Sequence, residues 1–142
     1  VAEIWESSQI GVRFSHENSF NDIHDSNPQA LFNYVAEVLC TKKLGYLHVV
    51  EGGFVGEHDV DYDQIRQRFD GNYMANLGYD QDKAQAAIAN GHADLVSFGA
   101  LFLANPDLVA RFKANADLNT PDMDTFYGGD EHGYTDYPFM NS

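Results

Sequence analysis

The sequence predicts an α/β fold built on a parallel β-sheet. Four short apolar segments recur along the 142 residues, and each is followed by a helical or loop stretch. Strands that alternate with helices are typical of βα units, in which consecutive strands run parallel. The units differ in length, and neither a sequence repeat nor a linker interrupts them, so we expect one domain over residues 1–142.

The four expected strands are short, rich in β-branched or aromatic residues, and bounded by Gly, Asn or Asp, which is typical of buried strands. They span residues 10–14, 46–50, 72–75 and 94–98. In parallel α/β sheets, ligands bind at the carboxyl ends of the strands. We therefore expect functional residues directly after these segments.

The clearest helix follows Asn27-Pro28, where Asn can cap the first turn and Pro suits the first helical position. Lys42 and Lys43 are expected in its last turn, and Gly45 is expected to end it. Its apolar residues fall on one face at helical spacing. They are Leu31, Phe32, Val35, Val38 and Leu39.

Three further helices are predicted. A short helix spans residues 63–69, and a longer one is capped by Asp80 and ends at Asn90-Gly91 with the help of His92. The last begins at Asn105-Pro106 by the same cap-plus-Pro signal. Its expected buried stripe consists of Leu108, Val109 and Phe112.

The two ends of the chain differ from the regular units between them. Residues 120–142 are expected to form an irregular tail, because Gly, Tyr, Asp and Pro dominate and no periodicity survives. Its aromatic residues indicate that it packs against other parts of the protein: Phe126, Tyr127, Tyr134, Tyr137 and Phe139. The first residues, Val1–Trp5, look like the end of a helix, so we expect the chain to begin within a larger fold.

Charge and cysteine content exclude several classes of partner. Acidic residues outnumber basic residues 22 to 8, which gives a net charge of −14. This charge repels nucleic-acid phosphates and anionic lipid surfaces, so we expect neither as a partner. The one cysteine, Cys40, excludes an internal disulfide and a cysteine-based zinc site. Because no membrane-spanning run or signal-peptide pattern is present, we expect a cytoplasmic protein.

Arg13 is the first candidate functional residue, because an unpaired arginine within an apolar strand is costly. One interpretation is a salt bridge to a neighbouring carboxylate. The other is a cation aimed at an electron-rich ligand. His48, between Leu47 and Val49, is interpreted as a hydrogen-bonded core residue.

No metal site is predicted, because none of the six histidines has a metal-binding spacing. They are His16, His24, His48, His58, His92 and His132. The acidic segment 57–63 is interpreted as a solvated charge run, since it lacks the Gly and the terminal Glu of a calcium loop. Dinucleotide, P-loop and nucleophile-elbow motifs are absent as well.

Several motifs resemble the Old Yellow Enzyme family. The "GVRLSP…FND…DSNP" stretch of that family is matched by Gly11-Val12-Arg13-Phe14-Ser15, Phe20-Asn21-Asp22 and Asp25-Ser26-Asn27-Pro28. Its next strand is matched by residues 46–51, and its last strand and helix by residues 93–99 and 102–108. Its C-terminal signature is matched by Phe126-Tyr127-Gly128-Gly129 and residues 133–138. The match runs from end to end in the family's order.

The resemblance implies a TIM-barrel (β/α)8 fold, of which this chain covers strands five to eight. Members of the family are FMN-dependent NAD(P)H oxidoreductases. They reduce activated alkenes, such as α,β-unsaturated carbonyls, and nitro compounds by hydride transfer from reduced flavin. The family's substrate-anchoring His/His or His/Asn pair, its Tyr proton donor, and its flavin-binding Thr and Gln belong to the first half. We therefore expect these groups to be absent from this chain.

The resemblance also assigns residues to the flavin. Arg13 lies beside the pyrimidine edge, where a cation stabilises negative charge on the reduced ring. Tyr127 matches the C-terminal aromatic near flavin and substrate, and is the expected catalytic residue. The turns after the third and fourth strands match the FMN-phosphate site, where backbone N–H groups bind anions. These turns contain Ala75, Asn76, Leu77, Gly78, Gly99 and Ala100.

Two residues depart from the family pattern at the phosphate site. Leu77 stands where Gly is usual, and Ala100 stands where an Arg that binds the phosphate is usual. Losing a charge-assisted hydrogen bond costs roughly 1.5–3 kcal/mol. We expect Leu77 to crowd the approach of the phosphate, or to lose the left-handed backbone conformation that Gly adopts readily.

Two functions remain open at this point. The chain is expected to be the C-terminal half of an ene-reductase, completed by an N-terminal half-barrel and using NAD(P)H to reduce a small-molecule substrate. The alternative is a non-catalytic half-barrel scaffold that has lost tight FMN binding. A four-stranded half exposes two sheet edges and an apolar inner face, so a second copy of the chain could close an eight-stranded barrel.

Overall fold

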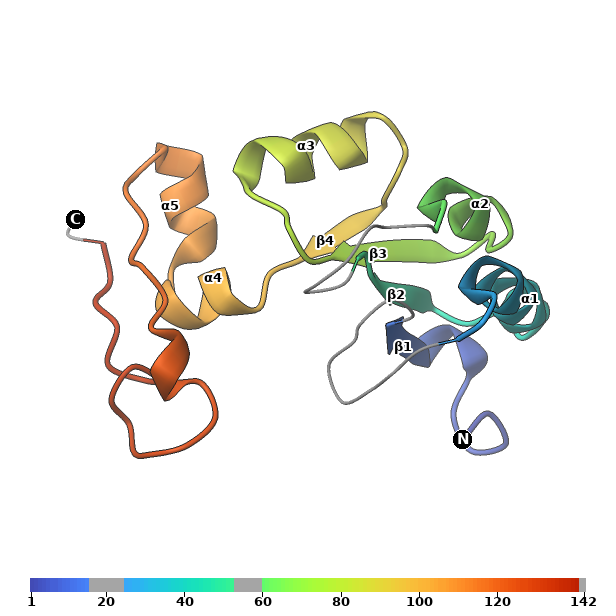
Figure 1. Ribbon diagram of the computed structural model, residues 1–142, viewed down its shortest axis with the longest axis horizontal. Coiled ribbons are helices and arrows are strands. Elements are labelled where there is room, and N and C mark those ends of the chain that lie inside the picture. The colour runs from blue at the N-terminus through green and yellow to red at the C-terminus, as the bar shows by residue number, and fades with distance from the viewer. Residues whose placement is uncertain (16–24, 53–59, 141–142) are drawn as a thin grey trace. The chain divides into compact units, whose positions relative to one another are not determined.

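The computed structural model describes residues 1–15, 25–52 and 60–140 (Figure 1). Contacts divide the chain into two compact units, Val1–Ser97 and Phe98–Ser142. Each unit is described by itself. The single domain expected over residues 1–142 stays a prediction.

A four-stranded parallel sheet forms the centre of the first unit, as predicted. Its strands are β1 (Gly11–Ser15), β2 (Tyr46–Val50), β3 (Asn72–Asn76) and β4 (Leu95–Ser97), in the order β1-β2-β3-β4. The register aligns Val12 with Leu47 and Leu47 with Tyr73. Because side chains alternate along a strand, these residues share one face of the sheet.

Three helices connect the strands: α1 (Pro28–Thr41), α2 (Tyr62–Gln67) and α3 (Gln81–Ala89). Each begins at a side-chain cap, which satisfies a backbone N–H that would otherwise lack a partner. Asn27 accepts from Ala30 N, Asp61 from Gln64 N, and Asp80 from Lys83 N. Before β1, a 3-10 helix spans Ser7–Gln9, and Trp5 N donates to Val1 O at 3.1 Å in a single turn.

The end of α1 differs from the prediction. The helix stops at Thr41, so Lys42 and Lys43 lie beyond its last turn. Lys43 adopts the left-handed backbone (φ 54°), not Gly45. Position 45 needs a glycine for a different reason: the Cβ of any other residue there would lie 2.2 Å from the backbone oxygen of Ser8.

The core lies between one face of the sheet and the three helices (Figure 1). Leu47, Val49, Tyr73 and Ala75 are fully buried on the sheet side. The helices contribute one small or branched residue each at the centre, and these are Ala36, Ile65 and Ala87. Burying a large aliphatic or aromatic side chain contributes about 1.5–3 kcal/mol, so this layer supplies most of the unit's stability.

A nearly buried carboxylate, Glu51, ties the carboxyl end of β2 to its neighbours. It accepts hydrogen bonds from the hydroxyls of Tyr73 at 2.7 Å and Tyr79 at 2.5 Å, and from His92 Nε2 at 2.9 Å. The other ring nitrogen of His92 lies 2.6 Å from Asp63 Oδ1. Hydrogen bonds to Glu51, and then to Asp63, raise the pKa of His92 to about 9. His92 N donates to Ala87 O, so it also helps end α3, as predicted.

The second unit contains α4 (Ala100–Ala104), α5 (Leu108–Ala114) and a 3-10 helix, Met123–Thr125. The helix predicted at Asn105-Pro106 is present as α5, but it begins at Leu108, and the separate short helix α4 precedes it. Asn105 ends α4, and its buried amide bonds Leu101 O and both the N–H and C=O of Asn119. The predicted stripe on α5 is also wrong at Val109, whose side chain is 53% exposed.

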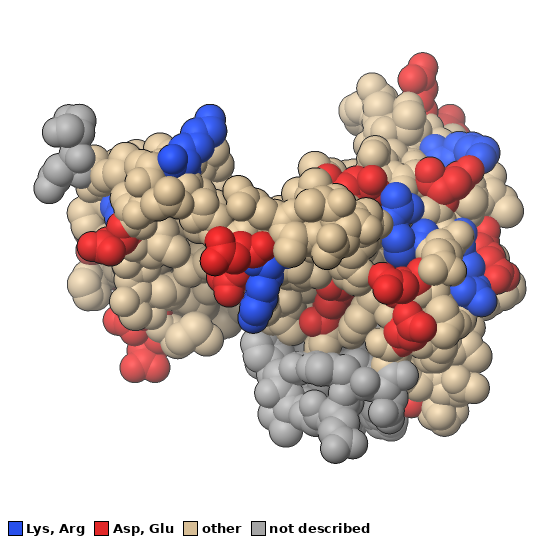
Figure 2. Space-filling view, turned by 90° about the horizontal axis from the view of Figure 1, so that it is seen from above, with Lys and Arg blue, Asp and Glu red and all other residues tan. Residues whose placement is uncertain are grey.

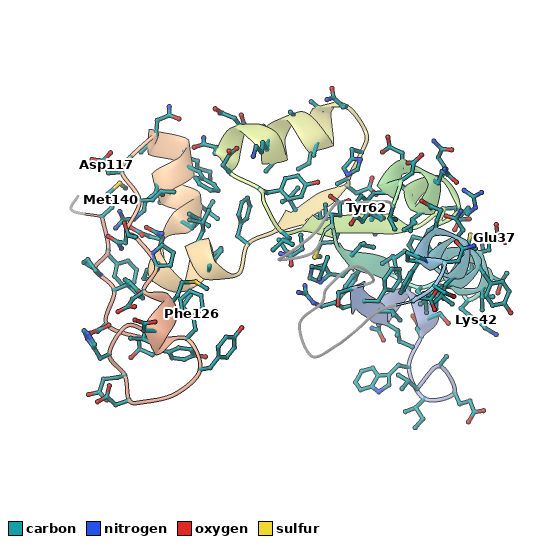
Figure 3. All side chains as sticks on the ribbon, in the orientation of Figure 1. Glu37, Lys42, Tyr62, Asp117, Phe126 and Met140 are labelled. Carbon is teal, nitrogen blue, oxygen red and sulfur yellow. The ribbon has the colours of Figure 1, made fainter. Side chains whose placement is uncertain are left out.

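Arg111 is the buried residue on α5 that the apolar pattern missed. Its Nε donates to Asp107 Oδ1 at 2.7 Å, and its two Nη atoms donate to the carbonyls of Asp117 and Pro138 at 2.6 and 2.8 Å. Met140 N donates to the second oxygen of Asp107. Figure 3 labels Asp117 and Met140, which both lie beside α5. One ion pair therefore holds the returning tail.

The tail is irregular, as predicted, but its aromatic residues do not bury themselves within the second unit. Tyr127 is 94% exposed, Phe139 67% and Tyr134 54%. Tyr137 instead uses its hydroxyl to accept from Asp122 N at 2.8 Å. Backbone and side-chain hydrogen bonds, more than apolar contact, hold this segment.

Acidic side chains are spread over the surface with basic ones among them (Figure 2). Surface ion pairs include Lys43 with Asp70 at 2.8 Å and Arg68 with Glu37 at 3.1 Å. Such surface pairs add little to stability, because water and salt screen them. In the described part of the chain, no helix is both long enough and apolar enough to cross a membrane.

The Glu51–His92 contact predicts how stability depends on pH. Because the pKa of His92 is higher in the folded state than its ordinary 6.5, its contribution is complete below pH 6.5 and is lost as the pH rises through 9. The free energy of unfolding should fall over this interval by about 1–2 kcal/mol, which is less than the full shift would give because solvent screens the partly exposed ring. Urea titrations across this pH range measure it. His92→Gln should flatten this decline, whereas His132→Gln should keep most of it, because His132 pairs with Asp136 on the exposed surface. An equal decline in all three proteins would contradict the assignment.

Replacing the buried arginine should loosen the tail. Arg111→Met leaves the Asp107 carboxylate without its ion-pair partner and the carbonyls of Asp117 and Pro138 without their donor, which is destabilising. Amide hydrogen exchange should therefore accelerate over residues 117–140. Lys113→Met, an exposed position on the same helix, is the matched control and should leave exchange unchanged.

Candidate functional site

A row of polar side chains crosses the face of the sheet opposite the helices. It contains Arg13 from β1, His48 from β2, Asn76 from β3 and Ser97 from β4. The register pairs Arg13 with His48, and Asn76 with Ser97. The expectation of an apolar inner face is therefore wrong along this row. Successive side chains of a strand point to opposite faces of the sheet, so burial of Leu47 and Val49 under the helices directs His48 to the inner face.

Hydrogen bonds connect the row from one edge strand to the other. Arg13 Nη1 lies 2.7 Å from His48 Nε2, and Arg13 Nη2 donates to Asn76 Oδ1 at 3.1 Å. His48 Nε2 also lies 2.8 Å from Ser97 Oγ. Asn76 Nδ2 donates to the backbone oxygen of Ser97 at 2.8 Å. Four strands thus contribute to the placement of one guanidinium.

Arg13 makes its contacts with neutral groups. Within the described residues its hydrogen-bond partners are an imidazole and an amide, and no salt bridge to a carboxylate is found. The side chain is exposed. Of the interpretations offered by the sequence, the cation aimed at an electron-rich ligand stays a prediction. A guanidinium has five N–H donors, so contacts to His48 and Asn76 leave donors for an electron-rich group.

His48 is half-buried beside this cation. Burial, and then the charge of Arg13, lower the pKa of His48 below its ordinary value. The imidazole is therefore neutral at neutral pH, which allows a ring nitrogen to accept from an arginine. The prediction of a hydrogen-bonded histidine is confirmed, but its assignment to the core is wrong, because His48 lies on the face of the sheet opposite the core.

The turn after β3 carries Leu77 and Gly78. Both have left-handed backbones, with φ of 82° and 74°. The expectation that Leu77 would lose this conformation is wrong: the residue adopts it, at a cost of about 1–2 kcal/mol for a side chain of this kind. Ala75, which precedes the turn in β3, is buried, and a Cβ at Gly78 would meet nothing within 4 Å.

Three predicted site residues lie in the second unit. Gly99 precedes α4 with φ −90°, and Ala100 is the first residue of that helix, where backbone N–H groups lack partners within the helix. Tyr127 lies in the tail, and its ring makes an edge contact with the ring of Phe126 at 6.3 Å between centroids. Nothing buries the Tyr127 side chain within that unit.

The remaining polar candidates are engaged elsewhere or lie outside the described residues. His132 contacts Asp136 at 2.9 Å, and Cys40 donates to Asp70 at 3.1 Å. Among the residues that the structure describes, no cluster of His, Cys, Asp or Glu could hold a metal ion. His16, His24, His58 and residues 57–59 of the acidic segment fall outside those residues.

Ser97 is the member of the row that sequence reasoning missed, together with the contact between His48 and Arg13. A signal was present, because Arg13 and His48 are each the central residue of a five-residue strand. In parallel strands paired end to end, central residues are neighbours on one face. To infer from the sequence that Arg13 and His48 are neighbours, the boundaries of both strands would have to be known to within one residue.

The comparisons with known proteins agree with the predicted resemblance. The model of the NADH:flavin oxidoreductase / NADH oxidase family matches residues 1–119. A 12-oxophytodienoate reductase 1 of Oryza sativa subsp. japonica is 41% identical over 148 residues, covering 99% of this chain and 38% of the relative. A Leishmania infantum protein named "Probable flavin mononucleotide-dependent alkene reductase" is 42% identical, covering 93% of this chain and 36% of the relative.

Solved structures give the same result. The old yellow enzyme from Trypanosoma cruzi matches with a TM-score of 0.93 and 36% identity over 99% of this chain and 37% of that one. Morphinone reductase in complex with tetrahydroNAD matches with a TM-score of 0.87 and 41% identity over 99% of this chain and 38% of that one. The chain spans less than two fifths of these relatives. On this sequence and structural similarity, it belongs to the NADH:flavin oxidoreductase / NADH oxidase family.

Proposed function

We propose that this chain is the part of an FMN-dependent NAD(P)H oxidoreductase that positions the flavin, in an enzyme that reduces activated alkenes or nitro compounds. The observation that carries the proposal is Arg13, an exposed cation held on the sheet by neutral partners. The names of relatives, which include an FMN-dependent alkene reductase and a reductase bound to tetrahydroNAD, support this cofactor and this reductant.

The arrangement fits a flavin at Arg13. The pyrimidine edge of FMN carries hydrogen-bond acceptors and gains negative charge on reduction, and a guanidinium supplies donors and positive charge at one place. When bound, FMN supplies the hydride that reduces the substrate. Arg13 stabilises the negative charge of the reduced ring, while His48 and Asn76 orient its guanidinium.

The phosphate of FMN is proposed to contact backbone N–H groups. Leu77 and Gly78 form consecutive left-handed positions after β3, and backbone turns of this kind make anion-binding concavities. For Gly99, Ala100 and the catalytic Tyr127, the same proposal rests on the resemblance alone.

The rest of the enzyme is proposed to come from an N-terminal half-barrel. This chain would then provide strands five to eight of a (β/α)8 barrel, and the missing half would bring the substrate-anchoring pair and the proton donor. The proposal is supported by the share of the relatives that the chain covers, 36% and 38%. A cytoplasmic location is proposed with it.

A second candidate is a non-catalytic half-barrel that associates with another copy of itself. It is favoured by Ala100, which lacks the cation that family members direct at the phosphate, and by the edge strands β1 and β4, which each have one neighbour in the sheet. Two copies could pair these edges about a two-fold axis.

Reconstitution tests the first function. The chain, mixed with FMN and the N-terminal half-barrel of a family relative, should show flavin absorbance and oxidise NAD(P)H in the presence of an activated alkene. Arg13→Gln should lower turnover roughly 10²-fold, as removal of one electrostatic stabiliser typically does. Arg68→Gln, a half-buried arginine at the end of α2 that pairs with Glu37, is the control and should keep full activity.

Absence of flavin absorbance and of NAD(P)H oxidation with a folded N-terminal partner would reject the enzyme function. Dimerisation of the chain alone at micromolar concentration, measured by sedimentation velocity, would then support the second candidate. A monomeric chain under those conditions would reject that candidate too.

Restoring the family residues at the phosphate turns should strengthen FMN binding in the reconstituted protein. Ala100→Arg should tighten it about 10- to 100-fold, as expected for one charge-assisted hydrogen bond. Leu77→Gly should tighten it as well, because Gly adopts the left-handed backbone without strain. Flavin fluorescence titration measures both changes. Ala110→Arg and Leu77→Ala are the matched controls, and an equal gain in either control would contradict this assignment.

A further inference from the structure

Arg13 would be mobile without its neighbours on the sheet. An arginine side chain has many rotamers, and Arg13 is exposed on an edge strand of the sheet. The two groups that restrain it, His48 and Asn76, come from β2 and β3. Its position therefore depends on residues 35 and 63 places further along the chain.

Asn76 can restrain Arg13 in only one orientation. Its Nδ2 donates to the backbone oxygen of Ser97 at 2.8 Å, and this contact directs Oδ1 toward Arg13 Nη2. The amide is therefore already oriented to accept. Because the backbone of β4 holds it, Asn76 offers Arg13 an acceptor that does not titrate.

His48 can restrain Arg13 only in its neutral form. Arginine has donors and no acceptor, so a ring nitrogen that accepts from Arg13 Nη1 carries no proton. A protonated ring would place two cations against each other and would remove the acceptor. Among the described residues, the neighbours of His48 on β3 and β4 are Met74 and Ser97, which carry no charge.

We propose that neutral His48, together with Asn76, is a positioning residue that holds the Arg13 guanidinium in place on the inner face of the sheet. The proposal rests on the proposed function for the identity of the ligand, which is the flavin. The contact of His48 and Asn76 with Arg13 does not depend on the proposed function. The low pKa of His48 agrees with this role, because burial and the Arg13 charge both favour the neutral ring.

The first experiment uses NMR on the 142-residue chain without flavin. The imidazole of His48 should titrate below 6.5. In Arg13→Gln its midpoint should rise, since a positive charge at hydrogen-bond distance favours the neutral ring and the substitution removes it. His132, which contacts Asp136 in the other unit, should titrate identically in both proteins. An unchanged His48 midpoint in Arg13→Gln would overturn the proposal.

The second experiment follows the guanidinium itself. Rotation and hydrogen exchange of the Arg13 Nη groups should be slow in the chain and fast in His48→Leu. His48→Gln, whose amide oxygen can accept in place of Nε2, should restore slow exchange. If the Nη groups exchange equally slowly in His48→Leu, or if His48→Gln fails to rescue while circular dichroism shows a native fold, His48 does not position Arg13.

The two proposals fail separately. Slow, His48-dependent exchange at Arg13 in a chain that never binds FMN upholds the positioning role and rejects the proposed function. FMN binding with Arg13 signals insensitive to His48→Leu upholds the proposed function and rejects the positioning role. In reconstituted protein, His48→Leu should lower turnover with little change in the KM for NAD(P)H, and His48→Gln should recover turnover.

Discussion

Coverage of one face of the sheet by α1, α2 and α3 is the constraint on which the first unit depends. Because strand residues alternate between faces, burial of Leu47 and Val49 under the helices directs His48 to the opposite face. Parallel register then places Arg13 beside it. A slip of one residue would turn His48 toward the apolar layer and expose Leu47. The stability of the core and the geometry of the polar row are therefore one property of the sheet.

Buried charge is managed in the same way in both units. Glu51 is surrounded by three donors and Arg111 by three acceptors, so neither charge is left without partners. Burying an ionised group without partners costs several kcal/mol. These contacts therefore act as specific tethers: one joins β2 to the segment after α3, and the other holds the tail on α5. Arg13 differs, because its partners among the described residues, His48 and Asn76, are neutral.

Local sequence signals predicted most elements of the first unit. They failed where the same short motif is compatible with two different structures. Asp80 and Asn27 cap helices as expected, since a cap acts on residues three positions away. Asn105-Pro106 gives the same local signal, yet Asn105 ends α4 and bonds Asn119 across a turn. At Leu77 the residue type argued against a left-handed backbone, but the turn between β3 and α3 imposes it.

The sequence by itself determined the alternation of strands and helices, the parallel sheet and the family to which the chain belongs, because these depend on periodicity and on motifs that are contiguous in the chain. Tertiary structure decided which groups meet: His48 and Asn76 with Arg13, and Glu51 with His92. These partners lie 35 to 63 residues apart in sequence. Only the register of the strands and the packing of the helices bring such distant side chains within hydrogen-bond distance, and no local pattern encodes that distance.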